Sequence, residues 1–222
     1  MPTVAQSPSF VAPLRLMQQP SARRRERRPP KPLDTSSLEE LALTYVARFA
    51  TSAGKLERYL RRKLRERGWA EESADGGEAV TAIVERFIAQ AYVDDEGFAH
   101  GRSRSLTRRG YGPRRVEAAL REAGIAEEVR QAARPHERRQ RQAALDLARK
   151  RGFGPWNRAE ERDEDAPRSF EQLAADRAAR DKQLAAMLRA GHSFEVARTV
   201  LEFTSELEAE RWVDEAEELD TC

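Results

Sequence analysis

Residues 116–125 have the sequence VEAALREAGI, the pattern of a helix followed by its end. Val116 and Leu120 are four residues apart and therefore share one helix face, and Gly124 suits the left-handed conformation that closes many helices. Two other segments repeat this order, the second with one residue fewer before the glycine: residues 60–69 (LRRKLRERGW) and 184–192 (LAAMLRAGH). Because a helical pattern lies on each side of every copy, the sequence predicts three tandem three-helix units, at residues 37–92, 93–134 and 135–203.

The rest of the chain is also typical of helices. No segment alternates between apolar and polar residues over the length of a strand, and β-branched residues are sparse. Of the 222 residues, 35% are charged and 39% hydrophobic, which argues against one large core and for thin helical layers with solvated faces. We therefore predict an all-α fold, whose first unit has helices at about 38–50, 55–67 and 78–91, the first of them capped by Ser36 or Ser37.

Three segments flank or interrupt these units. Residues 1–36 hold seven of the 11 prolines and an arginine-rich cluster, so we expect a disordered arm, with phosphate binding by a flexible arm as the alternative. Residues 154–169 contain two prolines and an acidic run, which indicates a surface loop in the third unit. Residues 204–222 are predicted to form an acidic tail that extends the last helix and then frays. From Glu202 onward nine acids and one base give a net charge of −8, and the tail either keeps the protein soluble or covers a basic surface.

Positive charge is concentrated in three stretches, although the net charge of the whole chain is only +2. Residues 55–67 carry seven bases and two acids, residues 102–115 six bases and no acid, and residues 134–151 seven bases and two acids. Most of these bases are arginines, whose guanidinium groups bind phosphate or carboxylate oxygens in pairs. Such stretches in successive units favour an electropositive face that meets a polyanion or an acidic protein groove. For residues 134–151 an ordinary solvated helix face is an equally good interpretation.

The densest basic motif is residues 108–115, RRGYGPRR. Gly110 and Gly112 permit a tight turn between two helices, and Pro113 suits the first turn of the second helix. Four arginines around Tyr111 fit a phosphate clamp in which the tyrosine ring stacks on a base. The alternative is that Tyr111 packs the turn.

Several classes of site are not indicated. The chain has no Walker A sequence, no dinucleotide-binding loop and no zinc motif, and its only cysteine is Cys222. The three histidines lie far apart, His192 in a helix–helix turn where a structural role is expected, and Asp94 is better explained as a helix N-cap than as a metal ligand. We therefore expect no enzyme activity, no metal and no cofactor. No apolar run is long enough to cross a bilayer, so we expect a cytoplasmic protein without membrane contact.

The sequence resembles the RecX family, regulators of the bacterial RecA recombinase. The resemblance covers roughly residues 40–203 and is carried by five motifs: residues 60–68 (LRRKLRERG), 91–99 (AYVDDEGFA), 108–116 (RRGYGPRRV), 120–125 (LREAGI) and 188–197 (LRAGHSFEVA). The chain departs from the family at Gly97, where an arginine or a similar residue is usual, and in the arm, the acidic loop and the acidic tail.

This resemblance implies an elongated array of three-helix repeats that binds in the groove of the RecA–DNA filament and limits strand exchange, coprotease activity and ATP hydrolysis. It implies as partners the RecA filament and single- and double-stranded DNA, and we expect a monomer. A sequence-tolerant DNA-binding protein that acts without RecA is the alternative. The candidate RecA- and DNA-binding residues are Arg58, Arg61, Arg62, Arg108, Arg109, Tyr111, Arg114 and Arg115.

Overall fold

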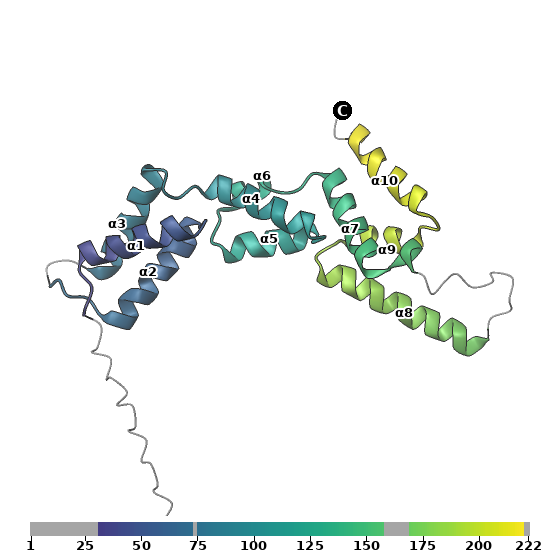
Figure 1. Ribbon diagram of the computed structural model, residues 1–222, viewed down its shortest axis with the longest axis horizontal. Coiled ribbons are helices and arrows are strands. Elements are labelled where there is room, and N and C mark those ends of the chain that lie inside the picture. The colour runs from purple at the N-terminus through teal and green to yellow at the C-terminus, as the bar shows by residue number, and fades with distance from the viewer. Residues whose placement is uncertain (1–30, 73–74, 158–168, 220–222) are drawn as a thin grey trace, which may run out of the picture. The chain divides into compact units, whose positions relative to one another are not determined.

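The computed structural model describes residues 31–72, 75–157 and 169–219 (Figure 1). In these residues ten α-helices and one 3-10 helix follow one another, and an isolated β-bridge joins Leu33 to Trp69. The predicted all-α class is confirmed. In chain order the elements are α1 (Thr35–Arg48), α2 (Ala53–Arg67), α3 (Gly76–Ala89), α4 (Asp95–Arg108), α5 (Pro113–Glu122), α6 (Glu127–Ala132), α7 (Glu137–Arg151), η1 (Gly154–Trp156), α8 (Phe170–Arg189), α9 (Phe194–Glu202) and α10 (Glu206–Leu219).

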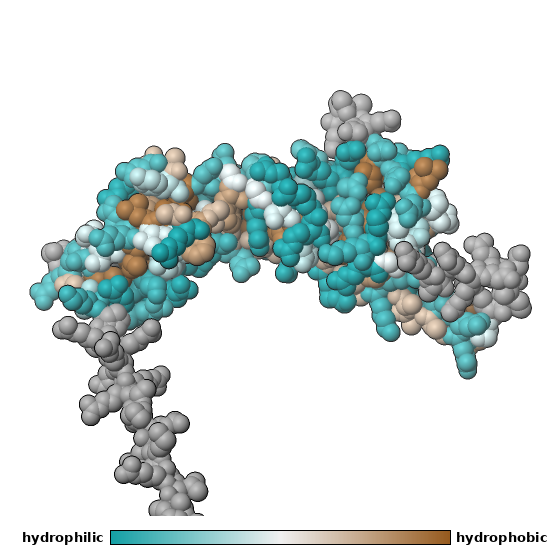
Figure 2. All heavy atoms as spheres, viewed as in Figure 1, coloured by the Kyte–Doolittle hydropathy of each residue, from teal (hydrophilic) through white to brown (hydrophobic). Residues whose placement is uncertain are grey.

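The buried side chains form three separate hydrophobic cores instead of one. The first core lies among α1, α2 and α3, the second among α4, α5 and α6, and the third among α7, α8, α9 and α10. Two of the repeated positions, Leu60 in the first core and Leu120 in the second, are fully buried, whereas Leu184 and Leu188 are partly buried against the third core. Figure 2 shows mostly hydrophilic side chains on one face, with hydrophobic side chains in small separate areas.

The helix ends predicted at glycines and the N-cap predicted at Asp94 are confirmed, whereas the cap predicted for the first helix is wrong. Gly68, Gly124 and Gly191 all have positive φ angles, of 80°, 78° and 95°, and each lies directly at or after the end of a helix. Asp94 caps α4 by accepting a hydrogen bond from the amide of Gly97 at 2.9 Å. The cap of α1, however, is Asp34 and not a serine: its carboxylate accepts from the amide of Ser37 at 2.8 Å.

Part of the expected arm is built into the first core. Leu33 is fully buried, its amide donates to the carbonyl of Gly68, and its own carbonyl accepts from the amide of Ala70. These two backbone hydrogen bonds hold the chain against the end of α2, so residues 33–36 do not belong to a disordered arm. The rest of that arm, residues 1–30, lies outside the described residues.

The acidic segment 204–222 is not an extension of α9. Phe203 has an extended conformation that ends α9, and Ser205 accepts a hydrogen bond from the amide of Glu208 at the start of α10. Ala209, Val213 and Ala216 are three or four residues apart, so they share one face of α10, and all three are buried. This apolar stripe packs α10 on α7 as a further helix of the third core. The expected loop at 154–169 begins instead with η1, and its acidic part, 158–168, lies outside the described residues.

Consecutive cores meet at a joint between two glycines. At the first joint Gly54, in the first turn of α2, faces Gly124, which follows α5, and a Cβ atom built on Gly54 would lie 2.9 Å from the Cα of Gly124. Hydrogen bonds close the same joint: Ser52 Oγ donates to the carbonyl of Ala123 at 2.6 Å, and the amide of Ala53 donates to Asp95 Oδ1 at 2.8 Å.

The second joint has the same construction. Gly112, at the start of α5, faces Gly191, which follows α8, and a Cβ atom on Gly112 would lie 2.5 Å from the carbonyl group of Gly191. The amide of Gly112 donates to the carbonyl of Ala190 at 3.0 Å, and the amide of Arg114 donates to that of Gly191 at 3.1 Å. At both joints, therefore, the start of the second helix of one unit meets the glycine that follows the second helix of the next unit: α2 meets the end of α5, and α5 meets the end of α8.

His192 lies beneath the second joint and has the structural role expected of it. It is fully buried, and its Nε2–H donates to the carbonyl of Gly110 at 3.0 Å. Its Nδ1 has no hydrogen-bond partner among the described residues. A second proton on this ring would therefore be a buried charge whose N–H has no acceptor.

Acidification is expected to destabilise the protein through His192. Burial lowers the pKa of this imidazole below its ordinary value of 6.5, and the hydrogen bond to Gly110 opposes that shift only in part. Because the unfolded chain takes up the proton first, the stability present above pH 6.5 is lost as the pH falls towards the folded-state pKa. Unfolding midpoints between about pH 8 and about pH 5 should fall more steeply for the wild type than for a His192→Gln variant. Equal slopes would contradict this role.

Candidate functional site

The basic motif 108–115 forms the turn between α4 and α5. The amide of Gly110 donates to the carbonyl of Thr107, and Gly110 has a φ of 83°, the left-handed conformation that closes α4. Gly112 is the N-cap of α5 and Pro113 its first residue, as predicted. The role of Gly112 differs from the expected one, because its φ of −78° is accessible to any residue. Glycine is needed there because of the close approach to Gly191.

Two of the four arginines lie over the ring of Tyr111. The guanidinium carbons of Arg109 and Arg115 are 5.3 and 5.9 Å from the ring centroid, within the range of cation–π contacts. Tyr111 is half-buried and packs against both the second and the third core. Both interpretations of Tyr111 therefore apply in part, since the ring packs the turn and also holds two cations beside it.

The arginines of residues 102–115 form an electropositive surface on α4, the turn and α5. All six side chains are exposed, and none makes an ion pair with a carboxylate of the described residues. Six unneutralised guanidinium groups in so short a segment attract anions strongly. These arginines are Arg102, Arg104, Arg108, Arg109, Arg114 and Arg115.

Arg114 has different surroundings from the two arginines over Tyr111. It lines a groove of about 490 Å3 between α5, α6 and the start of α7, together with Arg121 and Arg134. This groove also contains Glu117, which pairs with Arg130 at 2.7 Å, so its charge is mixed. The predicted residues 108, 109, 111 and 115 thus share one turn, and Arg114 borders it from the next groove.

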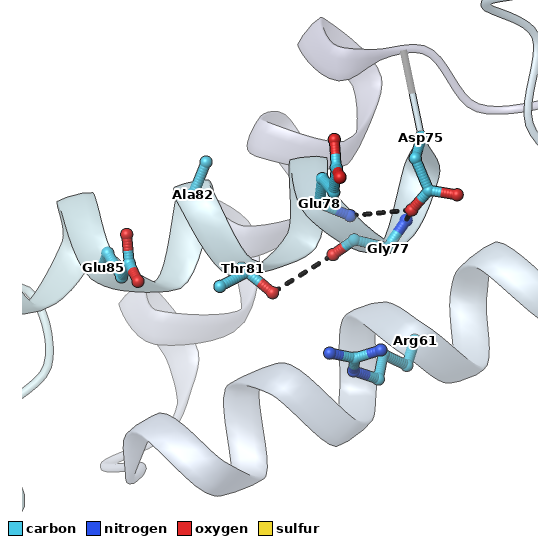
Figure 3. A pocket seen from close by; sticks show the side chains of 7 residues that line it. All are labelled: Arg61, Asp75, Gly77, Glu78, Thr81, Ala82 and Glu85. Atoms are coloured by element: carbon cyan, nitrogen blue, oxygen red, sulfur yellow. Dashed lines mark hydrogen bonds between the residues drawn. The ribbon is translucent and has the colours of Figure 1, made fainter.

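The candidate residues of α2 have different surroundings from one another. Arg58 donates from Nη2 to the carbonyl of Glu122 at 2.6 Å and so reinforces the first joint. Arg61 pairs with Glu57 at 2.8 Å and borders an acidic hollow at the start of α3, where Figure 3 shows it below Gly77 and Glu78. Arg62 lies 3.6 Å from Glu66, which binds Lys63 more closely.

Two arginines of the third basic stretch form ion pairs with α10. Arg149 on α7 lies 3.1 Å from Glu210 and 3.6 Å from Glu206, and Arg138 lies 3.6 Å from Asp214. The guanidinium group of Arg141 lies 4.7 Å from the centroid of the Trp212 ring. The described part of the acidic segment therefore contacts basic residues, but those of α7 and not those of residues 102–115.

Two kinds of site are not found in the part of the chain that the structure describes. Residues 31–72, 75–157 and 169–219 contain no group of three potential ligands, His, Cys, Asp or Glu, that could hold a metal ion. None of the described helices combines the length and the apolar character needed to cross a bilayer.

Comparison with known proteins identifies the family. Residues 94–133 match the family model described as RecX, second three-helix domain. The chain is 31% identical over 188 residues to the regulatory protein RecX of Myxococcus xanthus (strain DK1622), a match that covers 81% of this chain and 93% of that protein. The chain belongs to the RecX family. The regulatory protein RecX of Agrobacterium fabrum is 32% identical over 145 residues, 64% of this chain and 70% of that protein.

Two solved RecX structures have a similar fold. The crystal structure of RecX from Lactobacillus salivarius superposes with a TM-score of 0.55 at 18% identity and covers 77% of this chain and 96% of that one. A second, described as the crystal structure of regulatory protein RecX, gives a TM-score of 0.50 at 21% identity and covers 75% and 72% of the two chains. The fold of this RecX-family chain is thus that of known RecX proteins.

One cluster of this RecX-family chain was not predicted as part of a site. Tyr45 on α1 and Tyr59 on α2 stack with their ring centroids 4.3 Å apart, next to the cations of α2. Tyr45 lies in the apolar stripe of α1, a position typical of a core residue, and it packs against the first core. Tyr59 follows Arg58 and precedes two further arginines, and this alternation of aromatic and basic residues was the available signal.

Proposed function

We propose that this RecX-family protein binds the RecA–DNA filament and limits the recombinase, coprotease and ATPase activities of RecA, without enzyme activity of its own. The six unneutralised arginines of residues 102–115 carry the proposal, because they suit the phosphates of filament-bound DNA and the carboxylates of a protein groove. In this view Arg108, Arg109, Arg114, Arg115 and Tyr111 form the main contact and Arg58, Arg61 and Arg62 a second one.

The three-helix units are the modules of this binding mode. We propose boundaries at residues 37–92, 93–134 and 135–203, with the acidic segment 204–222 attached to the third module. Several modules in one chain provide several weak contacts to a repeating partner, and linked contacts bind far more tightly than single ones. Because chromosomal DNA and RecA are the expected partners, the protein would act in the cytoplasm, as a monomer.

ATP hydrolysis by RecA on single-stranded DNA tests this function. Titration of the protein should stop hydrolysis at well below one molecule per RecA, because one bound molecule obstructs a filament of many subunits. The preferred RecA is that of the same organism, and bovine serum albumin at the same concentration is the control.

Two results would contradict the proposal. Unchanged hydrolysis, with DNA binding retained, would favour the alternative of a DNA-binding protein that acts without RecA. Inhibition that disappears when the single-stranded DNA is raised in proportion would indicate competition for DNA and not filament binding.

A further inference from the structure

The surface between α1 and α2 carries a row of three aromatic rings. The stacked pair Tyr45 and Tyr59 has an interplanar angle of 13°, and the ring of Phe49 lies 5.5 Å from that of Tyr45 at 49°. The two tyrosines are half-buried and support the first core, whereas Phe49 is 57% exposed and does not belong to that core. The row therefore ends in a ring that is open to a ligand.

Cations lie beside the two tyrosines of this row, whereas Phe49 does not line their groove but lies next to Tyr45. A groove of about 510 Å3 is lined by Tyr45, Tyr59 and five basic residues, and none of its lining residues is acidic. The guanidinium carbon of Arg62 lies 5.6 Å from the centroid of the Tyr59 ring. The basic residues are Lys55, Arg58, Arg61, Arg62 and Arg65.

Several of these cations keep donors for a ligand. Neither Lys55 nor Arg65 makes an ion pair with a carboxylate of the described residues, and Arg58 uses Nη2 for the carbonyl of Glu122. Burial lowers the pKa of the Lys55 amine, and the positive charges of Arg102 and Arg58 lower it further, against an opposing effect of the Glu122 carboxylate. The second effect shows that like charges gather here, and an anion in the groove would relieve their repulsion.

We propose that this aromatic–basic groove binds single-stranded DNA, with the phosphates on the cations and an unstacked base against the ring of Phe49. The inference rests on the proposed function and names the ligand of the first unit. Bases in a duplex are stacked on one another and present no ring face, whereas a single strand can place a base on an aromatic side chain. An acidic protein surface could pair with the cations, but it would leave the aromatic row without a partner.

The motif at 108–115 does not offer the same chemistry. The ring of Tyr111 is packed between two cores and already lies beside Arg109 and Arg115. Unlike this motif, the first unit has an exposed ring close to cations that make no ion pair with a described carboxylate, Lys55 and Arg65.

Fluorescence anisotropy with labelled oligo(dT) tests the groove without RecA. Phe49→Ala should weaken binding of oligo(dT) about fivefold or more, the effect expected for the loss of one stacked base, and should leave the binding of a hairpin duplex unchanged. Phe49→Leu should be as weak, since it keeps an apolar side chain without a ring, and Phe49→Trp should restore binding. Because Phe49 is exposed, the variants should keep the circular dichroism spectrum of the wild type.

The cations have their own test. The double variant Lys55→Gln, Arg65→Gln should weaken oligo(dT) binding and reduce its salt dependence, because each lost phosphate contact lowers the salt slope by about 0.7 for a single strand. Arg177→Gln, Lys182→Gln removes the same charge from the exposed face of α8 and should leave binding unchanged.

The outcomes separate this proposal from the proposed function. Wild-type affinity for oligo(dT) in Phe49→Ala, or an equal loss for the duplex, would overturn the groove even if RecA hydrolysis is still inhibited. If Phe49→Ala or the double variant Lys55→Gln, Arg65→Gln binds oligo(dT) normally but no longer inhibits RecA, the proposed DNA groove is also overturned, since the groove would then contact protein. Failure of the wild type to inhibit RecA affects only the proposed function.

Discussion

Gly191→Ala is expected to open the joint between the second and third cores and to lower the free energy of unfolding by about 2–5 kcal/mol. The new Cβ would lie 2.4 Å from the amide nitrogen of Arg115, so the backbone must move, and overpacking of this kind is worth about 1–3 kcal/mol. The φ of 95° adds strain of about 1–2 kcal/mol for a residue with a side chain. Chemical denaturation gives the total, and hydrogen exchange at the amides of Gly112 and Arg114 shows whether the joint has opened.

Alanine variants of two other glycines separate the steric overlap from the backbone strain. Gly68 has a φ of 80° with open space around it, so Gly68→Ala should show the backbone strain alone. Gly101 lies within α4, has open space and no positive φ, and Gly101→Ala should therefore stabilise the protein by about 0.5–1 kcal/mol. If Gly191→Ala were no less stable than Gly68→Ala, the contact between the two cores would not contribute to stability.

Reversal of both Arg114 and Arg115 to glutamate is expected to weaken inhibition of RecA about 100-fold or more. Charge-assisted hydrogen bonds contribute about 1.5–3 kcal/mol each, and reversal replaces attraction by repulsion. Neither arginine makes an ion pair with a described carboxylate, so the fold should lose little more than the contact of Arg115 with Tyr111, about 0.5–1 kcal/mol. The concentration that halves RecA hydrolysis is the measurement, with circular dichroism as the test of helicity.

A charge-matched variant is needed because the reversal changes the net charge by four. Arg177→Glu, Lys182→Glu makes the same change on the exposed face of α8, away from the proposed contact. Equal loss of inhibition in the two variants would mean that net charge alone decides binding. Unchanged inhibition in the Arg114, Arg115 variant would remove these residues from the proposed site.

Most of the fold could be predicted because it depends on local signals. The three copies of the helix–glycine pattern, the N-cap at Asp94 and the absence of alternation are all properties of short segments. The structure differs from the prediction where contact with a segment distant in sequence determines the conformation. Leu33 is held by the carbonyl of Gly68, and α10 is held by α7, and neither partner is adjacent in sequence.

The candidate site also has a part that local sequence predicts and a part that depends on distant contacts. The clustering of Arg108, Arg109, Tyr111 and Arg115 follows from one turn, so a sequence motif could indicate it. The pairing of Tyr45 with Tyr59 depends on how α1 crosses α2, and the use of Arg58 at the first joint depends on where α5 ends. Charge patterning shows where cations are abundant, but it does not show which of them are already bound.

The same kind of glycine–glycine joint occurs twice, so the three helical units form a short one-dimensional array in which each joint links neighbouring units. In such arrays stability is approximately a sum of the stabilities of the units and of their nearest-neighbour terms. A ligand on one unit can influence another only through the intervening joint, so the strength of the joint sets how far cooperativity extends along the chain. Tightening or loosening two small backbone contacts would therefore adjust how many units engage a polymeric partner together, without any change in the binding residues.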